Sequence, residues 1–201
     1  MLTIGLTGPS GAGKGVIASL FAEYGVPSVD TDKVYHDLLL PPSACLGELT
    51  VRFGTGILSP DGTLDRGALA AVVFAEGGGQ ELADLNAIAH RHILAKTREM
   101  LAAYEARGIP AVLVDAPQLF ESGFDRECDL ILSALAPYET RLARVMARDG
   151  LAEERARARL DASHTDDFFR ERSDAVIVND GLPEAVRADV SRLLNEWGIR
   201  L

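Results

Sequence analysis

One glycine-rich segment, Gly8-Pro9-Ser10-Gly11-Ala12-Gly13-Lys14-Gly15, constrains the fold of this chain more than any other feature of its sequence. The apolar run that precedes it, residues 2–7, predicts a short buried strand. After it, apolar residues recur at helical spacing and predict a helix over residues 14–24, which Gly25 ends. The pattern G-x-x-x-x-G-K between a strand and a helix is the signature of a phosphate-binding loop, or P-loop.

The P-loop sequence suits the binding of nucleotide phosphates. Glycines let successive backbone N–H groups point into one concavity, and the start of the following helix adds a positive dipole. Lys14 can neutralise the charge that grows on the β- and γ-phosphates during transfer, which gives it a catalytic role. The alternative is a glycine-rich turn that only joins strand to helix. The match favours ATP binding by Gly11, Ala12, Gly13, Lys14, Gly15 and Val16.

Gly15 departs from the usual P-loop pattern, because Ser or Thr at this position normally offers a hydroxyl to Mg²⁺. Val16 cannot supply a side-chain oxygen either. Mg²⁺ gives up its water reluctantly, so ATP oxygens and water can hold the ion. We therefore expect Mg²⁺ to arrive as Mg·ATP and to meet the loop through water, and we predict no metal ligand from the chain.

The rest of the sequence predicts alternating strands and helices in an α/β fold with a doubly wound sheet of five parallel strands. Near-continuous apolar runs indicate parallel strands that are covered on both faces. The helical stretch at about 36–110 is too long for a simple crossover, so it predicts a helical cap over the sheet edge. The other expected elements are strands at 26–29, 111–115, 129–134 and 175–178, helices at 33–40, 80–106 with one or more breaks, 137–149, from 153 onward and 183–197, and turns at 59–62 and 77–79.

Composition limits the partners of the chain. Its formal net charge of −10 argues against a general nucleic-acid or anionic-membrane surface. No apolar run is long enough to span a bilayer, and no signal peptide precedes the P-loop, so we expect a cytoplasmic location. Cys45 and Cys128 lie far apart among apolar neighbours and are expected to be buried thiols. The sequence leaves the oligomeric state open.

Arginines are concentrated in one part of this acidic chain, with eight between Arg141 and Arg172. Because a guanidinium fork matches phosphate oxygens, the cluster can act as a phosphate clamp. The alternative is a solvated helix face with ion pairs to Glu153 and Glu154. Composition alone does not separate the two.

Asp30 and Asp32 follow the second predicted strand, at the carboxyl edge where open α/β sheets bind ligands. A carboxylate there can accept the proton of a substrate hydroxyl and orient it for attack on a γ-phosphate. Both residues can equally cap the helix that follows. Asp115 ends another apolar strand and can hold water around Mg²⁺ or cap the next turn.

A series of short motifs runs along almost the whole chain. They are Gly5-Leu6-Thr7-Gly8, Asp30-Thr31-Asp32-Lys33 with His36, Phe53-Gly54, Asp61-Gly62-Thr63-Leu64-Asp65-Arg66, Leu119-Phe120-Glu121-Ser122-Gly123, Arg148-Asp149-Gly150 and Asn179-Asp180-Gly181. Together these motifs resemble the dephospho-coenzyme A kinase family. The P-loop is common to many families, whereas the later motifs are specific when they occur together in this order. The chain departs from the family pattern at Gly15, Arg91, Gln118 and Ser163.

The resemblance implies a three-layer P-loop NTPase fold over residues 1–201, as a single kinase domain with a helical lid at about 138–165. It implies transfer of the γ-phosphate of ATP to the ribose 3′-hydroxyl of dephospho-coenzyme A, the last step of coenzyme A biosynthesis. Asp32 then matches the catalytic base, while Arg144 and catalytic Arg148 belong to the lid and Asn179 lies at the nucleotide. The residues implied for the acceptor are Asp32, His36, Arg66, His90, Leu119, Phe120, Glu121 and Gly123.

Two other functions stay open at this point. The P-loop sequence is also similar to that of cytidylate and adenylate kinases, and an acceptor screen with nucleoside monophosphates separates these from the first hypothesis. The departures from the family pattern leave room for a non-catalytic ATP-binding protein, which would bind ATP without transferring phosphate to any acceptor.

Overall fold

The computed structural model describes residues 1–75 and 79–199, and the chain forms two compact units. The first comprises Met1–Asp30 and Ala103–Leu201, and the second comprises Thr31–Ala102. The second unit covers most of the cap expected at 36–110, whereas the single domain over 1–201 stays a prediction. Of the turn expected at 77–79, residues 77 and 78 lie outside the described part of the chain.

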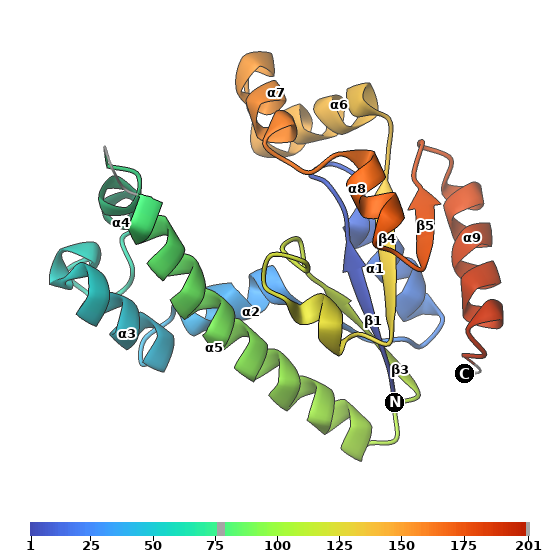
Figure 1. Cartoon of the computed structure of the whole chain (residues 1–201), viewed down its shortest axis with the longest axis horizontal. Helices are drawn as coiled ribbons and strands as arrows, with labels where there is room; N and C mark the ends of the chain where they lie inside the picture. Colours follow the sequence, from blue (N-terminus) through green and yellow to red (C-terminus); the bar gives the residue numbers. More distant parts are fainter. Residues whose placement is uncertain (76–78, 200–201) are drawn as a thin grey trace. The chain divides into compact units, whose positions relative to one another are not determined.

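A five-stranded sheet forms the centre of the first unit (Figure 1). Its order is β2-β3-β1-β4-β5, and every neighbouring pair is parallel, which confirms the predicted sheet. β1 lies between β3 and β4, so the P-loop that follows it leaves the sheet at the switch point where such sheets bind ligands. The strands are β1 (Leu2–Thr7), β2 (Ser28–Asp30), β3 (Ala111–Asp115), β4 (Leu130–Leu135) and β5 (Ala175–Val178).

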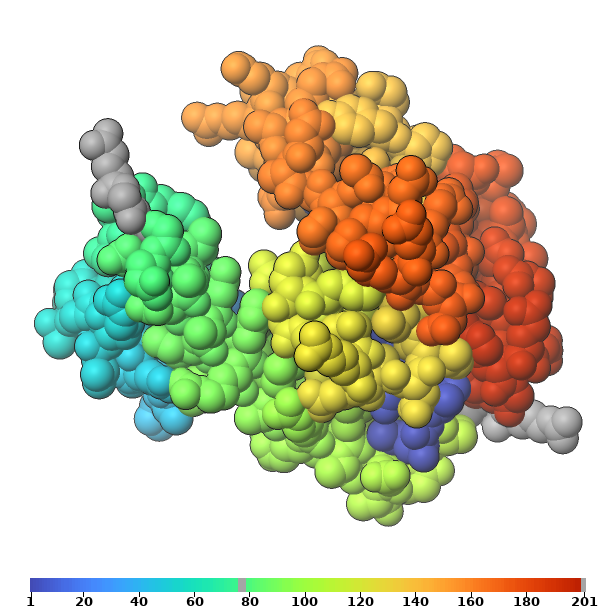
Figure 2. Space-filling model, in the orientation of Figure 1, coloured from blue at the N-terminus to red at the C-terminus, as the bar shows by residue number. Residues whose placement is uncertain are grey.

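One face of the sheet is covered by irregular chain and short helices. Gly5 of β1 faces residues 116–128, which include η2 (Phe124–Glu127), and a Cβ on Gly5 would lie 2.9 Å from both Leu119 and Cys128. Burial there raises the pKa of the Cys128 thiol to about 12. The short helix α8 (Asp166–Glu171), which the sequence analysis did not predict, packs against β4. Figure 2 shows the two covering segments side by side, in yellow and orange.

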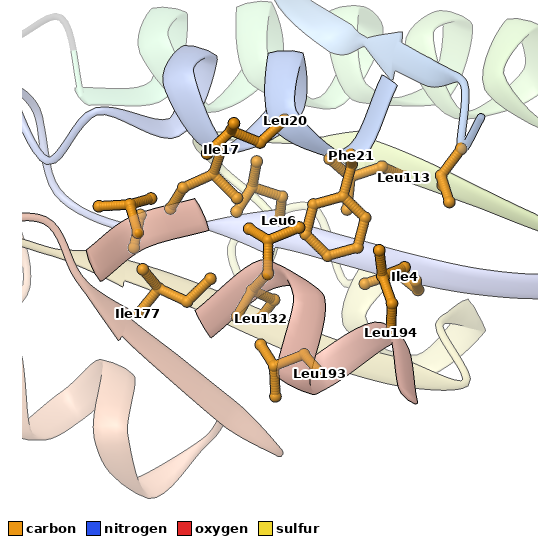
Figure 3. Close-up of a cluster of buried hydrophobic side chains, with 14 of the residues drawn as sticks. Ile4, Leu6, Ile17, Leu20, Phe21, Leu113, Leu132, Ile177, Leu193 and Leu194 are labelled. Carbon is orange, nitrogen blue, oxygen red and sulfur yellow. The ribbon is translucent and has the colours of Figure 1, made fainter. Parts of the chain in front are cut away.

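The opposite face carries the main hydrophobic core (Figure 3). Because side chains alternate along a strand, Ile4 and Leu6 of β1 point away from the face of Gly5 and pack under α1 (Lys14–Glu23) and α9 (Pro183–Glu196). Phe21 stacks on Trp197 with ring centroids 6.4 Å apart, so the tryptophan packs against the core. Each fully buried side chain of this kind contributes about 1.5–3 kcal/mol.

Two helices after β4 form a separate small cluster. They are α6 (Tyr138–Asp149) and α7 (Glu153–Asp161), and Gly150 joins them with a φ of 64°. Their buried side chains pack on one another and form their own cluster: Leu142, Val145, Ala156 and Leu160. The two helices therefore have the internal packing that a lid moving as one body requires.

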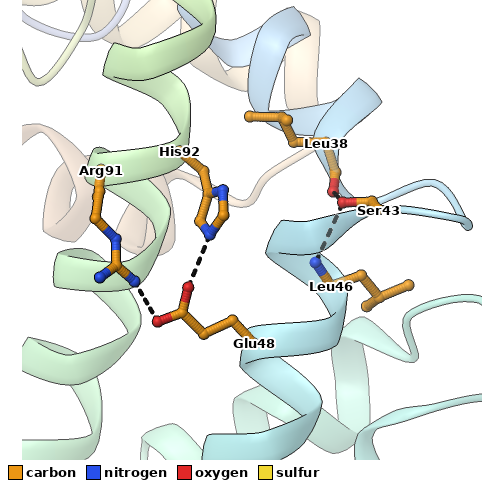
Figure 4. Close-up of polar contacts among 6 residues, drawn as sticks. All are labelled: Leu38, Ser43, Leu46, Glu48, Arg91 and His92. Carbon is orange, nitrogen blue, oxygen red and sulfur yellow. Dashed lines mark hydrogen bonds and ion pairs between the residues drawn. The ribbon is translucent and has the colours of Figure 1, made fainter.

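The second unit is helical, and its core is formed by Cys45, Leu49, Ile57, Leu69 and Val73 with their neighbours. Figure 4 shows two polar contacts that tie its helices: Glu48 accepts hydrogen bonds from Arg91 and His92, and Ser43 caps α3. These bonds hold the pKa of Glu48 below its usual range. Its elements are α2 (Thr31–Leu38), α3 (Ala44–Phe53), η1 (Thr55–Ile57), α4 (Arg66–Val73) and the larger part of α5 (Gly79–Ala106).

The expected breaks in the long helix at 80–106 were wrong, because α5 is continuous over 28 residues. Its interior contains neither proline nor glycine, so no residue interrupts its hydrogen bonds. The helix expected at 33–40 begins earlier, at Thr31, with Asp32 in the first turn, where acidic side chains are favourable. In the described residues, no helix has both the length and the apolar character needed to cross a membrane.

We predict that Gly8→Ala destabilises the first unit by about 2–4 kcal/mol. Gly8 has a φ of 135°, and its Cβ would lie 2.1 Å from the carbonyl oxygen of Ala134 in β4. Urea unfolding followed by circular dichroism measures the change. Gly47→Ala is the control, because Gly47 lies inside α3 with open space around an added Cβ, and alanine should stabilise that helix by up to about 1 kcal/mol. Equal unfolding midpoints for wild type and Gly8→Ala would contradict the packing argument.

Candidate active site

The P-loop connects β1 to α1 through glycines with positive φ. Gly11 and Gly13 both have positive φ, at 80° and 91°, a conformation that side-chain-bearing residues rarely adopt. A Cβ on Gly13 would lie 2.1 Å from the side-chain nitrogen of Asn179, and one on Gly11 would lie 2.7 Å from the backbone oxygen of Arg141. Glycine is therefore required at both positions by the residues that pack against the loop.

Asn179 and Arg144 hold the P-loop from two other elements. Asn179, directly after β5 and only 5% exposed, donates from Nδ2 to the carbonyl oxygen of Ala12 at 3.2 Å. Arg144 of α6 donates to the Gly11 carbonyl at 3.2 Å, and to the Asn179 carbonyl and side-chain oxygens at 3.3 and 3.1 Å. Of the predicted nucleotide-binding residues, the structure brings these two together with the loop.

Lys14 and Gly15 begin α1, next to the concave part of the loop. The Lys14 Nζ lies 3.4 Å from the Gly8 carbonyl oxygen, so its ammonium spans the loop. Nothing lies within 4 Å of a Cβ built on Gly15, and its φ is not in the left-handed region, so neither packing nor backbone strain requires glycine there. The side chain of Val16 is half exposed.

The other arginines of the cluster divide between structure and surface. Arg141, which the sequence analysis did not single out, is buried and donates to the Ala136 carbonyl at 2.9 Å. Arg148 pairs with Asp149 at 2.7 Å and holds the pKa of that carboxyl below its usual range. Arg157 pairs with Glu153 at 2.8 Å, as the surface alternative expects. The surface hypothesis therefore describes Arg157, whereas the phosphate-clamp hypothesis stays a prediction. In the sequence, Arg141 lies one helical turn after Pro137, at the start of the predicted helix. This spacing could have suggested that Arg141 faces the protein interior.

The segment after β3 carries the acceptor residues implied by the family motif. Leu119 is fully buried beneath Gly5, so it anchors the segment, and its direct contact with an acceptor stays a prediction. Phe120 meets Phe168 of α8 edge to face, with centroids 5.3 Å apart. Glu121 pairs with His164 at 3.0 Å, and Gly123 turns the chain with a φ of 74°.

The remaining candidates belong to the second unit. Asp32 is exposed in the first turn of α2, and His36 lies on the same helix, 3.5 Å from Asp37. Arg66 is the first residue of α4, which Asp65 caps, and His90 lies on α5. Their roles toward an acceptor stay predictions. Within residues 1–75 and 79–199, no group of three or more His, Cys, Asp or Glu side chains could hold a metal ion.

Mg²⁺, which the P-loop prediction implies, is suited to the oxygen groups at this sheet edge. The hydroxyl of Thr7, the last residue of β1, is buried without a hydrogen-bond partner in the described part of the chain. Asp115 ends the neighbouring β3, and Asp30 ends β2 on the far side of β3, in register with Asp115. Oxygen groups of this kind are suited to hold the water shell of Mg²⁺.

Comparison with known proteins identifies the family. Residues 2–184 match the family model described as dephospho-CoA kinase. A dephospho-CoA kinase from Corynebacterium glutamicum is 38% identical over 196 residues, which cover 98% of this chain and 97% of the relative. The solved dephospho-CoA kinase from Campylobacter jejuni superposes with a TM-score of 0.70 at 25% identity and covers 97% of this chain and 96% of its own.

A more distant structure, shikimate kinase from Acinetobacter baumannii, shares the fold with a TM-score of 0.53 at 16% identity and covers 100% of this chain and 96% of its own. The matches do not favour a cytidylate kinase or a non-catalytic ATP-binding protein, because family model and relatives agree over almost the full chain. The chain therefore belongs to the dephospho-CoA kinase family, whose members are ATP-using transferases of coenzyme A biosynthesis.

Proposed function

We propose that this enzyme transfers the γ-phosphate of ATP to the ribose 3′-hydroxyl of dephospho-coenzyme A, in the cytoplasm. The observation that carries the proposal is the P-loop held by Asn179 and Arg144 at the switch point of the sheet. There the backbone N–H groups of the loop at the start of α1 and the Lys14 ammonium are suited to cradle the phosphates. The acceptor follows from the family, whose members are named for it.

In this mechanism Asp32 accepts the proton of the attacking hydroxyl. Asp30 ends β2 and α2 begins at Thr31, so Asp32 follows the carboxyl edge of the sheet by two residues. Two helices, α6 and α7, form the lid, and Arg148 leaves Asp149 to contact the phosphates when the lid closes. Closure excludes water and so limits hydrolysis of ATP. His36, Arg66 and His90 contact the acceptor from the cap.

Bound Mg²⁺ would neutralise charge on the transferred phosphate. Gly15 offers no oxygen, so Thr7 and Asp115 would hold the ion through water.

We predict that dephospho-coenzyme A is phosphorylated and that cytidine monophosphate is a much poorer acceptor. A coupled assay for ADP formation gives the rates, and mass spectrometry of the product after digestion locates the new phosphate on the 3′-oxygen. Equal or better turnover of cytidine monophosphate would overturn the proposed acceptor.

Asp32→Asn should lower kcat by about 10²–10⁴ and leave the KM for ATP little changed, because the amide keeps the shape of the side chain but accepts no proton. Asp30→Asn is the matched control and should cost less. If Asp30→Asn has the larger effect on kcat, the role of base belongs to Asp30.

Arg148→Lys should lower kcat about 10-fold or more, since a point charge cannot reproduce a bidentate guanidinium on phosphate. Arg157→Lys on the same lid is the control, because Arg157 is paired with Glu153 on the surface and its change should be neutral. Wild-type kinetics in Arg148→Lys would mean that Arg148 serves only its surface pair with Asp149.

A further inference from the structure

A cavity of about 430 Å³ lies on the sheet face opposite the main core, between the segment 116–128 and α8. Ile131 of β4 lines it, and Ile131 is in register with Gly5 of β1. Figure 2 shows this face, where the yellow and orange segments meet. The proposed function uses Phe120 and Glu121 from its wall, but it gives no role to Arg126, His164, Phe168 or Arg172, which also line it.

One wall of the cavity is a stack of three side chains. His164 lies on Phe168 with centroids 3.8 Å apart and an interplanar angle of 12°, and the Arg172 guanidinium lies 4.1 Å from the same centroid. Two groups this close to one centroid cannot share a face of the ring, so Phe168 is held between them. Phe120 packs on its edge. The wall is therefore preorganised, which reduces the entropy lost on binding a ligand.

The charges of the cavity are balanced. Arg126 and Arg172 supply two guanidiniums, and Glu121 and Asp125 supply two carboxylates. Glu121 already pairs with His164, whereas the side chain of Arg126 makes no hydrogen bond or ion pair within residues 1–75 and 79–199. A phosphate would meet both carboxylates as well as the guanidiniums. A neutral chain of amides suits the lining better, because its N–H groups can donate to carboxylates and its carbonyls can accept from Arg126.

We propose that this cavity binds the pantetheine arm of the acceptor, a neutral chain with amide groups, geminal methyl groups and a terminal thiol. The inference rests on the proposed function, which supplies the acceptor. The arm begins beyond the diphosphate, so it must leave the phosphoryl-transfer point. Thr7, the last residue of β1, is in register with Ser133 of β4. Ile131 comes two residues before Ser133, so it lies about 7 Å further back along the strand. The cavity thus lies on the amino-terminal side of the P-loop level, where an arm leading away from the loop can bind.

Arg126→Ala tests the proposal, because Arg126 is exposed and has no ion pair among the described residues, so its loss should leave the fold intact. We expect KM for dephospho-coenzyme A to rise about 10-fold, with KM for ATP unchanged. In wild type, 4′-phosphopantetheine should inhibit competitively against dephospho-coenzyme A, and its inhibition constant should rise by a similar factor in the variant. Phe168→Leu, which removes the stacked ring but keeps an apolar side chain, should shift the same two constants.

Arg192→Ala on α9 is the control, because Arg192 pairs with Asp189 and Glu196 on the surface and should not change either constant. Unchanged KM for dephospho-coenzyme A in Arg126→Ala would overturn the proposal. Inhibition by inorganic pyrophosphate that weakens in Arg126→Ala, without a change for 4′-phosphopantetheine, would overturn it in favour of a diphosphate site.

Calorimetric titration of dephospho-coenzyme A into wild type and Arg126→Ala gives affinities without turnover. If wild-type enzyme bound this compound but did not phosphorylate it, the proposed function would fail. The cavity assignment would then be tested by the difference in affinity between wild type and Arg126→Ala.

Discussion

Asn179 and Arg144 reach the backbone of the P-loop because Gly11 and Gly13 carry no side chains. The amide of Asn179 bonds to the Ala12 carbonyl, and Arg144 bonds to both Gly11 and Asn179. These contacts join three parts of the first unit that are distant in sequence: the loop after β1, the end of β5 and the middle of α6. The concave loop that a nucleotide requires is thus held by tertiary contacts as well as by its own turns.

The same contacts join α6 to the P-loop. Arg144 lies on α6, whose buried apolar side chains pack on α7 within a small cluster. Arg144 therefore ties to the P-loop a pair of helices that has its own small core. Arg148 and Arg159 both bond to Asp149 here, and surface pairs of this kind are weak enough to exchange for phosphate.

The two faces of the sheet differ in how they are covered. Long helices α1 and α9 seal one face with a continuous apolar core. The other face is covered by the segment 116–128 and short α8, which leave a cavity between them. Gly5, in the middle of β1, lets Leu119 and Cys128 approach the sheet closely, and this anchors the segment that carries Phe120 and Glu121.

Much of this protein is determined by sequence alone. Apolar runs and glycine spacing are local patterns, so they predicted the five parallel strands, the P-loop and the helices at 137–149 and 183–197, and the ordered motifs predicted the family. The unbroken α5 was missed although its lack of proline and glycine is also local. What only the tertiary structure decided is which polar side chains meet. Arg144, Arg148 and Arg157 look alike in sequence, yet one bonds to the P-loop and two pair on the surface. The stack of His164 on Phe168 could not be predicted from the sequence as one wall of a cavity. That wall also includes Phe120, which is far away in the sequence and meets Phe168 only after folding brings the segment after β3 against α8.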